Sequence, residues 1–267
     1  ADNTYVGFKA GLGAAGAEAS NVGVGSNALL AITTGTDNTV IGTGAADALL
    51  TGIDNVIIGA GAGTATTAVD KTVIIGRAAG QANMTAAADG SIGIGYSALN
   101  ALTSGVGNVA IGSGSMAANA TSDNNTAVGT NALGRLTIDG EGSNTAVGYQ
   151  SGRAMTLGRY NTAIGFQALQ TEDVGDRSVA VGYAALYTQN SDSNNEITGN
   201  TGVGFYAGLY NVTGQNNTYI GYSAGAGASG QSNSNNTGVG SGALLAVTTG
   251  GGNVAIGKGS LLDNTDG

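Results

Sequence analysis

The chain of 267 residues contains no cysteine, histidine, tryptophan or proline, and only 9% of its residues are charged. Without cysteine or histidine it has no thiol nucleophile, no imidazole base and no soft-metal ligand, so we expect no cofactor and no metal. A formal charge of −9 with eight lysines and arginines argues against nucleic acid as a partner. No apolar run approaches the roughly 20 residues that span a bilayer, so we expect no membrane insertion.

What the chain does contain is a repeated pentapeptide: asparagine, then Thr, Val or Ile, a residue that is usually small, Val or Ile, and glycine. Residues 38–42, 108–112 and 161–165 are examples. The closing glycines are Gly7, Gly25, Gly42, Gly59, Gly76, Gly95, Gly112, Gly129, Gly148, Gly165, Gly182, Gly204, Gly221, Gly240 and Gly257. Fifteen copies at near-constant spacing indicate one repeat architecture, which we interpret as a single domain over residues 1–267.

Successive closing glycines are 17 residues apart in nine of fourteen cases, 19 in three, and 18 and 22 once each. Ala or Ser stands three residues after every one of them, and the next residue is mostly Leu or Gly. Because side chains alternate along a strand, the second and fourth pentapeptide positions share one face. Both positions favour β-branched residues, so we expect Ile111, Val147 and Ile164, and the residue two before each, to be nearly fully buried.

These columns predict an all-β fold, a parallel β-solenoid (β-roll) of fifteen coils with a usual length of 17 residues. In each coil a strand ends at the glycine corner, a second short extended stretch carries the alanine and leucine, and a polar turn leads back. Longer spacings are then insertions in surface turns. Coils stacked at about 4.8 Å make a rod of about 70 Å, with the asparagines in an amide ladder. A period of two and fifty glycines exclude a helical fold.

The column between the two β-branched positions predicts association of several chains. It is Ala or Gly in ten copies, and Val40, Ile57 and Ile74 in three successive ones. A strand with apolar residues on both faces is buried on both faces, so we expect this column at a subunit contact in a homotrimer. Replacing Ala146 or Ala163 by Glu is then expected to weaken assembly. A monomeric solenoid that exposes its small residues is the alternative.

The two ends of the repeat predict continuation. The first pentapeptide begins at Asn3, and a second copy placed after Gly267 would continue the repeat with a spacing of 17 from Gly257 to Gly7. Exposed terminal coils offer unpaired edge groups, which solenoids usually cap. We therefore expect either a longer fibre or copies stacked end to end.

Repeats that read Asn-Thr-Ala-Val/Ile-Gly-x-x-Ala-Leu/Gly, as at residues 161–169, resemble those of bacteriophage tail fibre proteins. They are also similar to the head repeats of trimeric autotransporter adhesins, where a Val-Ala-Ile-Gly strand builds a left-handed parallel β-roll. The resemblance implies a homotrimeric fibre shaft or adhesin segment of a virion tail fibre, displaying or contacting a host-surface glycan or protein receptor. A trimeric adhesin on the bacterial cell surface, or a self-assembling extracellular filament, is the alternative.

Aromatic residues follow the closing glycine in seven copies, five of them consecutive: Phe8, Tyr96, Tyr149, Phe166, Tyr183, Phe205 and Tyr222. They predict either a ladder of stacked rings that stiffens the coils or a strip that binds glycans. The longest coil, with its five extra residues, is a further candidate for recognition, because exposed loops on rigid scaffolds often bind partners. The predicted receptor-binding residues are Tyr183, Tyr187, Asp192, Glu196, Tyr206 and Tyr210.

The acidic residues predict no enzyme. Glu141, Glu172, Asp173 and Asp176 are scattered in turns, without the repeated carboxylate pair of a glycosidase. Asp-Asn pairs such as Asp37-Asn38 are explained by turn formation without a calcium ion. The expected function is therefore structural and adhesive, not catalytic.

Overall fold

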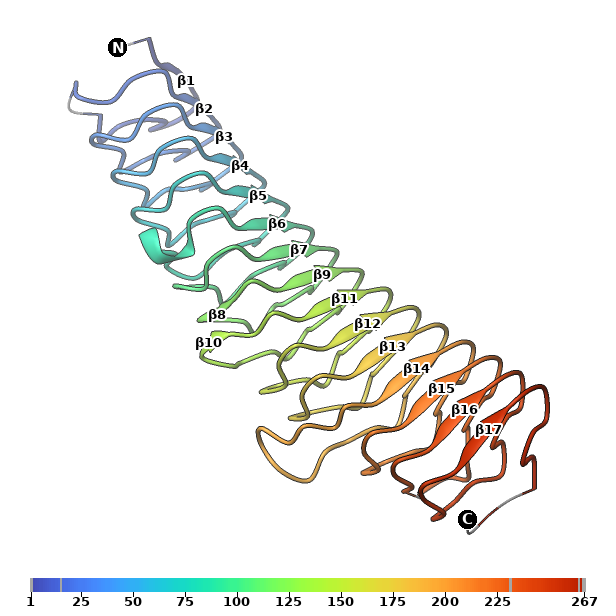
Figure 1. Cartoon of the computed structure of the whole chain (residues 1–267). Helices are drawn as coiled ribbons and strands as arrows, with labels where there is room; N and C mark the ends of the chain where they lie inside the picture. Colours follow the sequence, from blue (N-terminus) through green and yellow to red (C-terminus); the bar gives the residue numbers. More distant parts are fainter. Residues whose placement is uncertain (1, 15, 231, 264, 266–267) are drawn as a thin grey trace. The chain divides into compact units, whose positions relative to one another are not determined.

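The structure is a computed structural model that describes residues 2–14, 16–230, 232–263 and 265. It divides into two compact units: an N-terminal unit of Ala1–Thr130 with Thr137–Glu141, and a C-terminal unit of Asn131–Leu136 with Gly142–Gly267. In each unit every coil contributes one three-residue strand to a parallel sheet (Figure 1). The expected all-β parallel β-solenoid of about fifteen turns is confirmed.

The strands follow one another in sequence order within each sheet. Those of the N-terminal unit are β1 (Thr4–Val6), β2 (Val22–Val24), β3 (Thr39–Ile41), β4 (Val56–Ile58), β5 (Val73–Ile75), β6 (Ile92–Ile94), β7 (Val109–Ile111) and β9 (Thr126–Val128). Those of the C-terminal unit are β11 (Thr145–Val147), β12 (Thr162–Ile164), β13 (Val179–Val181), β14 (Thr201–Val203), β15 (Thr218–Ile220), β16 (Thr237–Val239) and β17 (Val254–Ile256). Equivalent positions pair, so that Ala163 lies beside Ala180.

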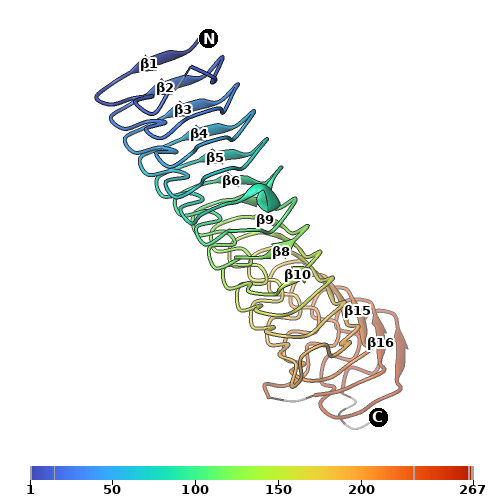
Figure 2. The same ribbon diagram turned by 90° about the vertical axis from the view of Figure 1, so that its left-hand side faces the viewer.

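The longer spacings are insertions at turns, as the repeat predicts. A 3₁₀-helix, η1 (Ala86–Ala88), fills the spacing of 19 before Gly95 (Figure 2). In the spacing of 19 before Gly148, β10 (Gly140–Glu141) pairs in parallel with β8 (Ser122–Asp123) of the N-terminal unit. Equivalent positions of β5, β6 and β7 still pair around the first insertion, and those of β11 and β12 pair after the second.

Glycine closes each strand because no other residue fits. Gly42 has φ +141°, and a Cβ added there would lie 2.5 Å from the carbonyl oxygen of Gly59 in the next coil. Both the backbone conformation and the close approach therefore require the missing side chain.

The asparagines form the expected ladder, buried inside the turn. Asn38 Nδ2 donates to Asn21 Oδ1 at 2.9 Å and to the Gly52 carbonyl at 2.7 Å, and Asn55 repeats the first bond to Asn38. Each amide thereby satisfies backbone groups that the narrow coil would otherwise leave buried and unpaired.

The predicted orientation of the strands is wrong. Ile111 and Ile164 are 37% and 38% exposed, Val147 is half-buried, and the preceding Thr or Val residues are half-buried as well. The middle residue points inward instead: Val40, Ile57 and Ile74 are fully buried, as are the alanines of that column. In-register columns of β-branched side chains pack along the sheet against their own copies, so strand propensity here does not require burial in the core.

This orientation overturns the predicted subunit contact through the middle column. Ala146 and Ala163 lie inside their own chain, with exposures of 0% and 1%, so a glutamate there would disturb folding before assembly. The prediction of a second extended stretch in each coil is also wrong. The residues after each glycine form consecutive turns, in which Asn27 and Leu29 have left-handed φ angles of 59° and 51°.

Two positions face each other across the narrow core and complement each other in size. Ile57 is paired with Gly63, where an added Cβ would lie 3.3 Å from the Ile57 Cδ1 atom. Where the strand offers only alanine, as at Ala163, the opposite position is a buried leucine, Leu169. Tyr219 is the largest fully buried side chain of the described residues, and its ring occupies the space that a Cβ at Gly225 would need.

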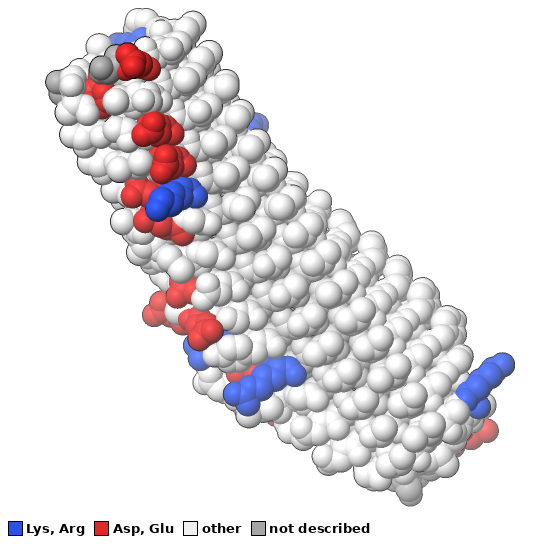
Figure 3. Space-filling view, turned by 45° about the horizontal axis from the view of Figure 1, so that its top comes forward, with Lys and Arg blue, Asp and Glu red and all other residues white. Residues whose placement is uncertain are grey.

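Charged residues avoid the sheet. The three-residue strands contain none, whereas the turns that precede them carry Asp37, Asp54 and Asp70. In Figure 3 most red and blue atoms gather along one margin, and the broad face beside them is white. The outer surface is therefore mostly uncharged, and aromatic residues distinguish one part of it from another.

Candidate functional site

The five consecutive aromatic residues form a stacked ladder on the C-terminal unit. We call Tyr149, Phe166, Tyr183, Phe205 and Tyr222 the aromatic ladder. Neighbouring ring centroids are 5.0–5.4 Å apart with interplanar angles of 5–16°. Parallel coils in register bring the same position of successive coils to about this distance, so the stacking follows from the repeat. The predicted ring contacts are confirmed.

These rings remain open to solvent although they stack. Their exposed fractions lie between 39% and 60%. A contiguous patch of exposed aromatic surface on a soluble protein usually marks a binding surface, because water solvates it poorly. The stiffening of the stack and the binding of a partner are therefore compatible roles for the same residues.

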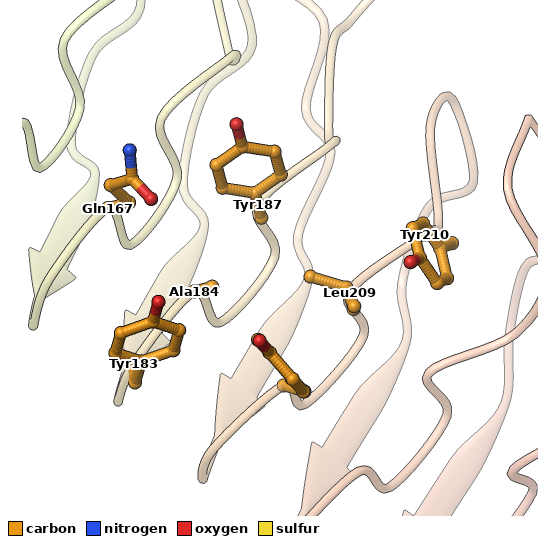
Figure 4. A pocket seen from close by; sticks show the side chains of 7 residues that line it. Gln167, Tyr183, Ala184, Tyr187, Leu209 and Tyr210 are labelled. Carbon is orange, nitrogen blue, oxygen red and sulfur yellow. The ribbon is translucent and has the colours of Figure 1, made fainter.

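Beside the ladder lies a hollow of about 230 Å³, the tyrosine hollow, which three successive coils enclose. It is lined by Gln167, Tyr183, Ala184, Tyr187, Tyr206, Leu209 and Tyr210. Figure 4 shows the labelled residues Gln167, Tyr183, Tyr187 and Tyr210 around one space. Tyr206 packs edge-on against Tyr183, with ring centroids 5.6 Å apart, and so joins the hollow to the ladder. The tyrosine hollow thus combines apolar ring faces with several hydroxyl groups.

Four of the six predicted receptor-binding residues, Tyr183, Tyr187, Tyr206 and Tyr210, line this hollow. The structure places the other two elsewhere. Asp192 and Glu196 lie on the five-residue insertion, where the backbone N–H of Asp192 donates to Glu196 Oε2 at 3.2 Å. Gln215 of the next coil also donates to Glu196, so this carboxylate is occupied by hydrogen bonds from the loop and from that coil.

Glu172, beside the five-residue insertion, has a structural role that the sequence did not predict. Glu172 is fully buried, and its Oε1 accepts hydrogen bonds from the backbone N–H groups of Gly175 at 2.8 Å and Ser191 at 3.2 Å. Its Oε2 accepts from Gln189 Nε2 at 2.8 Å and from Ser191 Oγ at 3.1 Å. Glu172 therefore fastens the start of the insertion to the preceding coil.

The neighbouring acids are occupied in a similar way. Asp173 accepts a hydrogen bond from Thr156, and Asp176 accepts one from the backbone N–H of Arg159 at 2.7 Å. Burial raises the pKa of the Asp176 carboxyl, because desolvation disfavours its charged form. Glu141 belongs to the N-terminal unit, in β10. Asp173 and Asp176 thus serve the hydrogen bonding of turns.

A second hollow, of about 200 Å³, adjoins the first through Tyr187, which lines both. Its other lining residues are Arg135, Arg153, Ala154, Gln170 and Thr171, and we call it the arginine hollow. The two arginines were not predicted as site residues. A signal was present, because Arg153 and Tyr187 both stand five residues after a closing glycine, and Arg135 and Tyr210 both stand six after one. Equivalent positions of a solenoid share one face.

Among the described residues, no helix is long and apolar enough to cross a membrane, and no group of acidic residues is arranged to hold a metal ion. The sequence matches no protein-family model, and no curated protein was found to be similar to it. The candidate site therefore rests on the geometry of the C-terminal unit.

Proposed function

We propose that this chain is a segment of an extracellular or virion-borne fibre that binds carbohydrate of a host cell surface through its C-terminal unit. The observation that carries the proposal is the exposed aromatic ladder with the tyrosine hollow beside it. A sugar ring presents C–H groups on its faces and hydroxyls around its rim. Aromatic faces bind the C–H groups of a sugar. Tyrosine hydroxyls, and an amide such as that of Gln167, bind its hydroxyl groups.

The solenoid supports this function by rigidity. Each coil contacts its neighbours through strand pairing, turn hydrogen bonds and the asparagine ladder, so the rings are held on a fixed framework. Binding to a preformed surface avoids the entropy cost of ordering loops, which favours affinity for small ligands. The proposed role is structural display combined with adhesion, on a phage tail fibre or, alternatively, on a bacterial surface.

Binding of a glycan array, followed by titration with the best ligand, tests the proposal. Tyr183→Ala and Tyr187→Ala are expected to lower affinity at least about ten-fold. Tyr96→Ala is the matched control: Tyr96 follows a closing glycine as Tyr183 does and is 56% exposed, but its column neighbours are Arg77 and Ser113. Absence of glycan binding, or equal losses for Tyr96→Ala and Tyr183→Ala, would overturn the proposal.

Self-association remains part of the proposal, through a different surface from the one first predicted. The outward Val and Ile positions, such as Ile41, Ile111 and Ile164, give the sheet an uncharged and partly apolar face. We infer that this face, rather than the middle column, would be covered in a homotrimer. Light scattering is expected to give three times the chain mass of 25.6 kDa for the native chain.

The double variant Ile111→Lys, Ile164→Lys tests which face is covered. It is expected to return the protein to 25.6 kDa without unfolding it, because both side chains point outward. A native mass of 25.6 kDa would remove the trimer from the proposal and leave glycan binding to be judged by its own test.

A filament is the second candidate, favoured by the way in which successive coils pair. Parallel strands in register, such as β12 and β13, and the asparagine ladder join each coil to the next by the same contacts. Coils of a second chain can be joined by the same contacts. Electron microscopy that shows only single particles of one chain length would contradict this candidate.

A further inference from the structure

The arginine hollow indicates which class of carbohydrate the site binds. Arg135 and Arg153 are two of only eight basic residues in a chain with a net charge of −9, and they line the same hollow. Among the described residues, neither guanidinium has a hydrogen-bonding or ion-pairing partner, and both side chains are exposed. Two arginines line this hollow and none of its lining residues is acidic, so an anion that enters is attracted by both positive charges.

The remaining lining is polar and partly unsatisfied. Gln170 is 9% exposed, its Nε2 donates to Gln150 Oε1 at 2.7 Å, and its Oε1 is buried without a hydrogen-bond partner among the described residues. Thr171 lines the hollow as well, and its hydroxyl is bonded to the backbone. A buried hydrogen-bond acceptor without a donor is uncommon in native structures. If the Gln170 amide rotates, a hydroxyl group of a bound ligand donates to its Oε1 atom.

The two hollows form one continuous line of ligand-binding groups. Leu133 N donates to Ser151 O at 3.1 Å and Gly152 N to Ala168 O at 3.0 Å, which places the segments bearing Arg135, Arg153 and Gln170 in successive coils. The next two coils carry Tyr187 and Tyr210. Four steps of about 4.8 Å give about 19 Å from the arginine end to the tyrosine end, which is more than a single sugar can reach.

We propose that the two hollows together bind an acidic oligosaccharide, with sugar rings on the tyrosines and a carboxylate or sulfate of the same chain between Arg135 and Arg153. This inference rests on the proposed carbohydrate binding and adds the charge and minimum length of the ligand. Arginine suits both anions, because its planar fork donates two parallel hydrogen bonds. Tyr187, which lines both hollows, joins the neutral part of the site to the anionic part.

The test is isothermal titration calorimetry of the full chain with three tetrasaccharides that share one linkage. Their units are galactose in the first, galacturonate in the second and sulfated galactose in the third. We expect at least one acidic ligand to bind about ten-fold more tightly than the neutral one at low salt. That advantage is expected to vanish as salt rises from about 50 to about 500 mM. The carboxylate and sulfate arms decide which anion the site takes.

The double variant Arg135→Gln, Arg153→Gln is expected to bind the acidic and neutral ligands equally. Lys71→Gln, Arg77→Gln removes the same charge from exposed positions of the N-terminal unit and is expected to retain the preference. Equal affinities of the native chain for all three ligands, or loss of preference in the control alone, would overturn the acidic assignment while leaving the carbohydrate site in place. If no ligand binds and the glycan array is also negative, both proposals fall.

Discussion

The two units are built on the same coil and differ in what they display. Both have inward middle residues, buried asparagines and a glycine corner. In the N-terminal unit the residues after the corner are chemically mixed, with Ser26, Thr43, Ala60 and Arg77 in successive coils. In the C-terminal unit the same position carries the five rings of the aromatic ladder. Inward positions are therefore constrained by the coil, whereas outward positions are free to carry recognition.

The strongest test of this division places one charge inward and one outward on β12. Ala163→Glu is expected to lower the free energy of unfolding by about 4 kcal/mol or more, because the carboxylate would be buried without a partner. Thr162→Glu, on the outer face of the same strand, is expected to change it by less than about 1 kcal/mol. Denaturant unfolding measures both. If Ala163→Glu stayed as stable as the native chain and only changed its oligomeric mass, the orientation of the strands would have to be reversed.

Each unit has a buried glutamate, but the two differ in what they hold. Glu18 of the N-terminal unit accepts hydrogen bonds from Gly16 N–H at 2.8 Å and Asn3 Nδ2 at 3.3 Å, whereas Glu172 holds the start of the five-residue insertion. Glu172→Ala is expected to cost about 3 kcal/mol, because Gln189 and the N–H groups of Gly175 and Ser191 would lose their acceptor while buried. Limited proteolysis is expected to cut first between residues 190 and 197. The control is Asp70→Ala in the N-terminal unit, which removes one exposed hydrogen bond, to Ile53 N. Equal losses for the two variants would mean that Glu172 is not an anchor.

The core is filled either by a large strand residue opposite glycine, as at Ile57 and Gly63, or by a small strand residue opposite a large one. Transferring the first arrangement into a coil that has the second tests whether the two are equivalent. Ala110→Ile alone is expected to cost about 1–3 kcal/mol, because Met116 already fills the opposite side. Adding Met116→Gly makes the pair resemble Ile57 with Gly63 and also removes a left-handed methionine with φ 46°. The double variant is expected to be more stable than the sum of its parts by about 1 kcal/mol or more. Additive losses in a double-mutant cycle would show that the two positions do not share one space.

The smallest expected effect is the pH dependence that Asp176 gives to the stability of the C-terminal unit. Burial raises the pKa of Asp176 in the folded chain, so the folded state binds the proton more tightly than the unfolded state does. The resulting stabilisation is complete below the unfolded pKa, near 3.9 for aspartate, and is lost as the pH rises through the folded pKa. Asp176→Asn is expected to remove this loss of unfolding free energy, which the native chain shows as the pH rises above about 3.9. Parallel profiles for the variant and the native chain would contradict this.

Much of the fold could be predicted because it depends on spacing alone. The pentapeptide and its usual spacing of 17 gave the parallel register, the asparagine ladder and the stacking from Tyr149 to Tyr222. Four tyrosines of the predicted site meet for the same reason: two coils in register place Tyr183 and Tyr187 beside Tyr206 and Tyr210.

The orientation of the strands could not be read from residue type, because Val and Ile suit both a core and a half-exposed sheet. The informative signal was the relation between columns: Ile57 and Ile74 occur with Gly63 and Gly80, whereas Gly93 occurs with Leu99. Such compensation requires that the two columns face each other, and hence that both point inward.

Glu172 stands seven residues after its closing glycine, a position that is buried in other coils as Leu49, Leu102 and Met155. Its role was not predictable, because no other coil has a carboxylate there and donors that bind it come from the coil that carries the insertion. Arg135 and Arg153 stand in two different columns, which they share with Tyr210 and Tyr187. The columns indicate a shared face, but only the three-dimensional structure showed that both arginines line one hollow.

The asparagine ladder also has a direction, and that direction restricts symmetry. In every rung that runs from Asn3 through Asn21 and Asn38 to Asn55, the later coil donates and the earlier coil accepts. A rotation by 180° across the ladder would set donor against donor, so no twofold axis can lie between two stacked coils. Only translation along the stack, with or without a screw rotation, preserves the pairing. Any second copy that prolonged the ladder would therefore repeat the same step without closing, and the product would be an open polar fibre rather than a closed dimer.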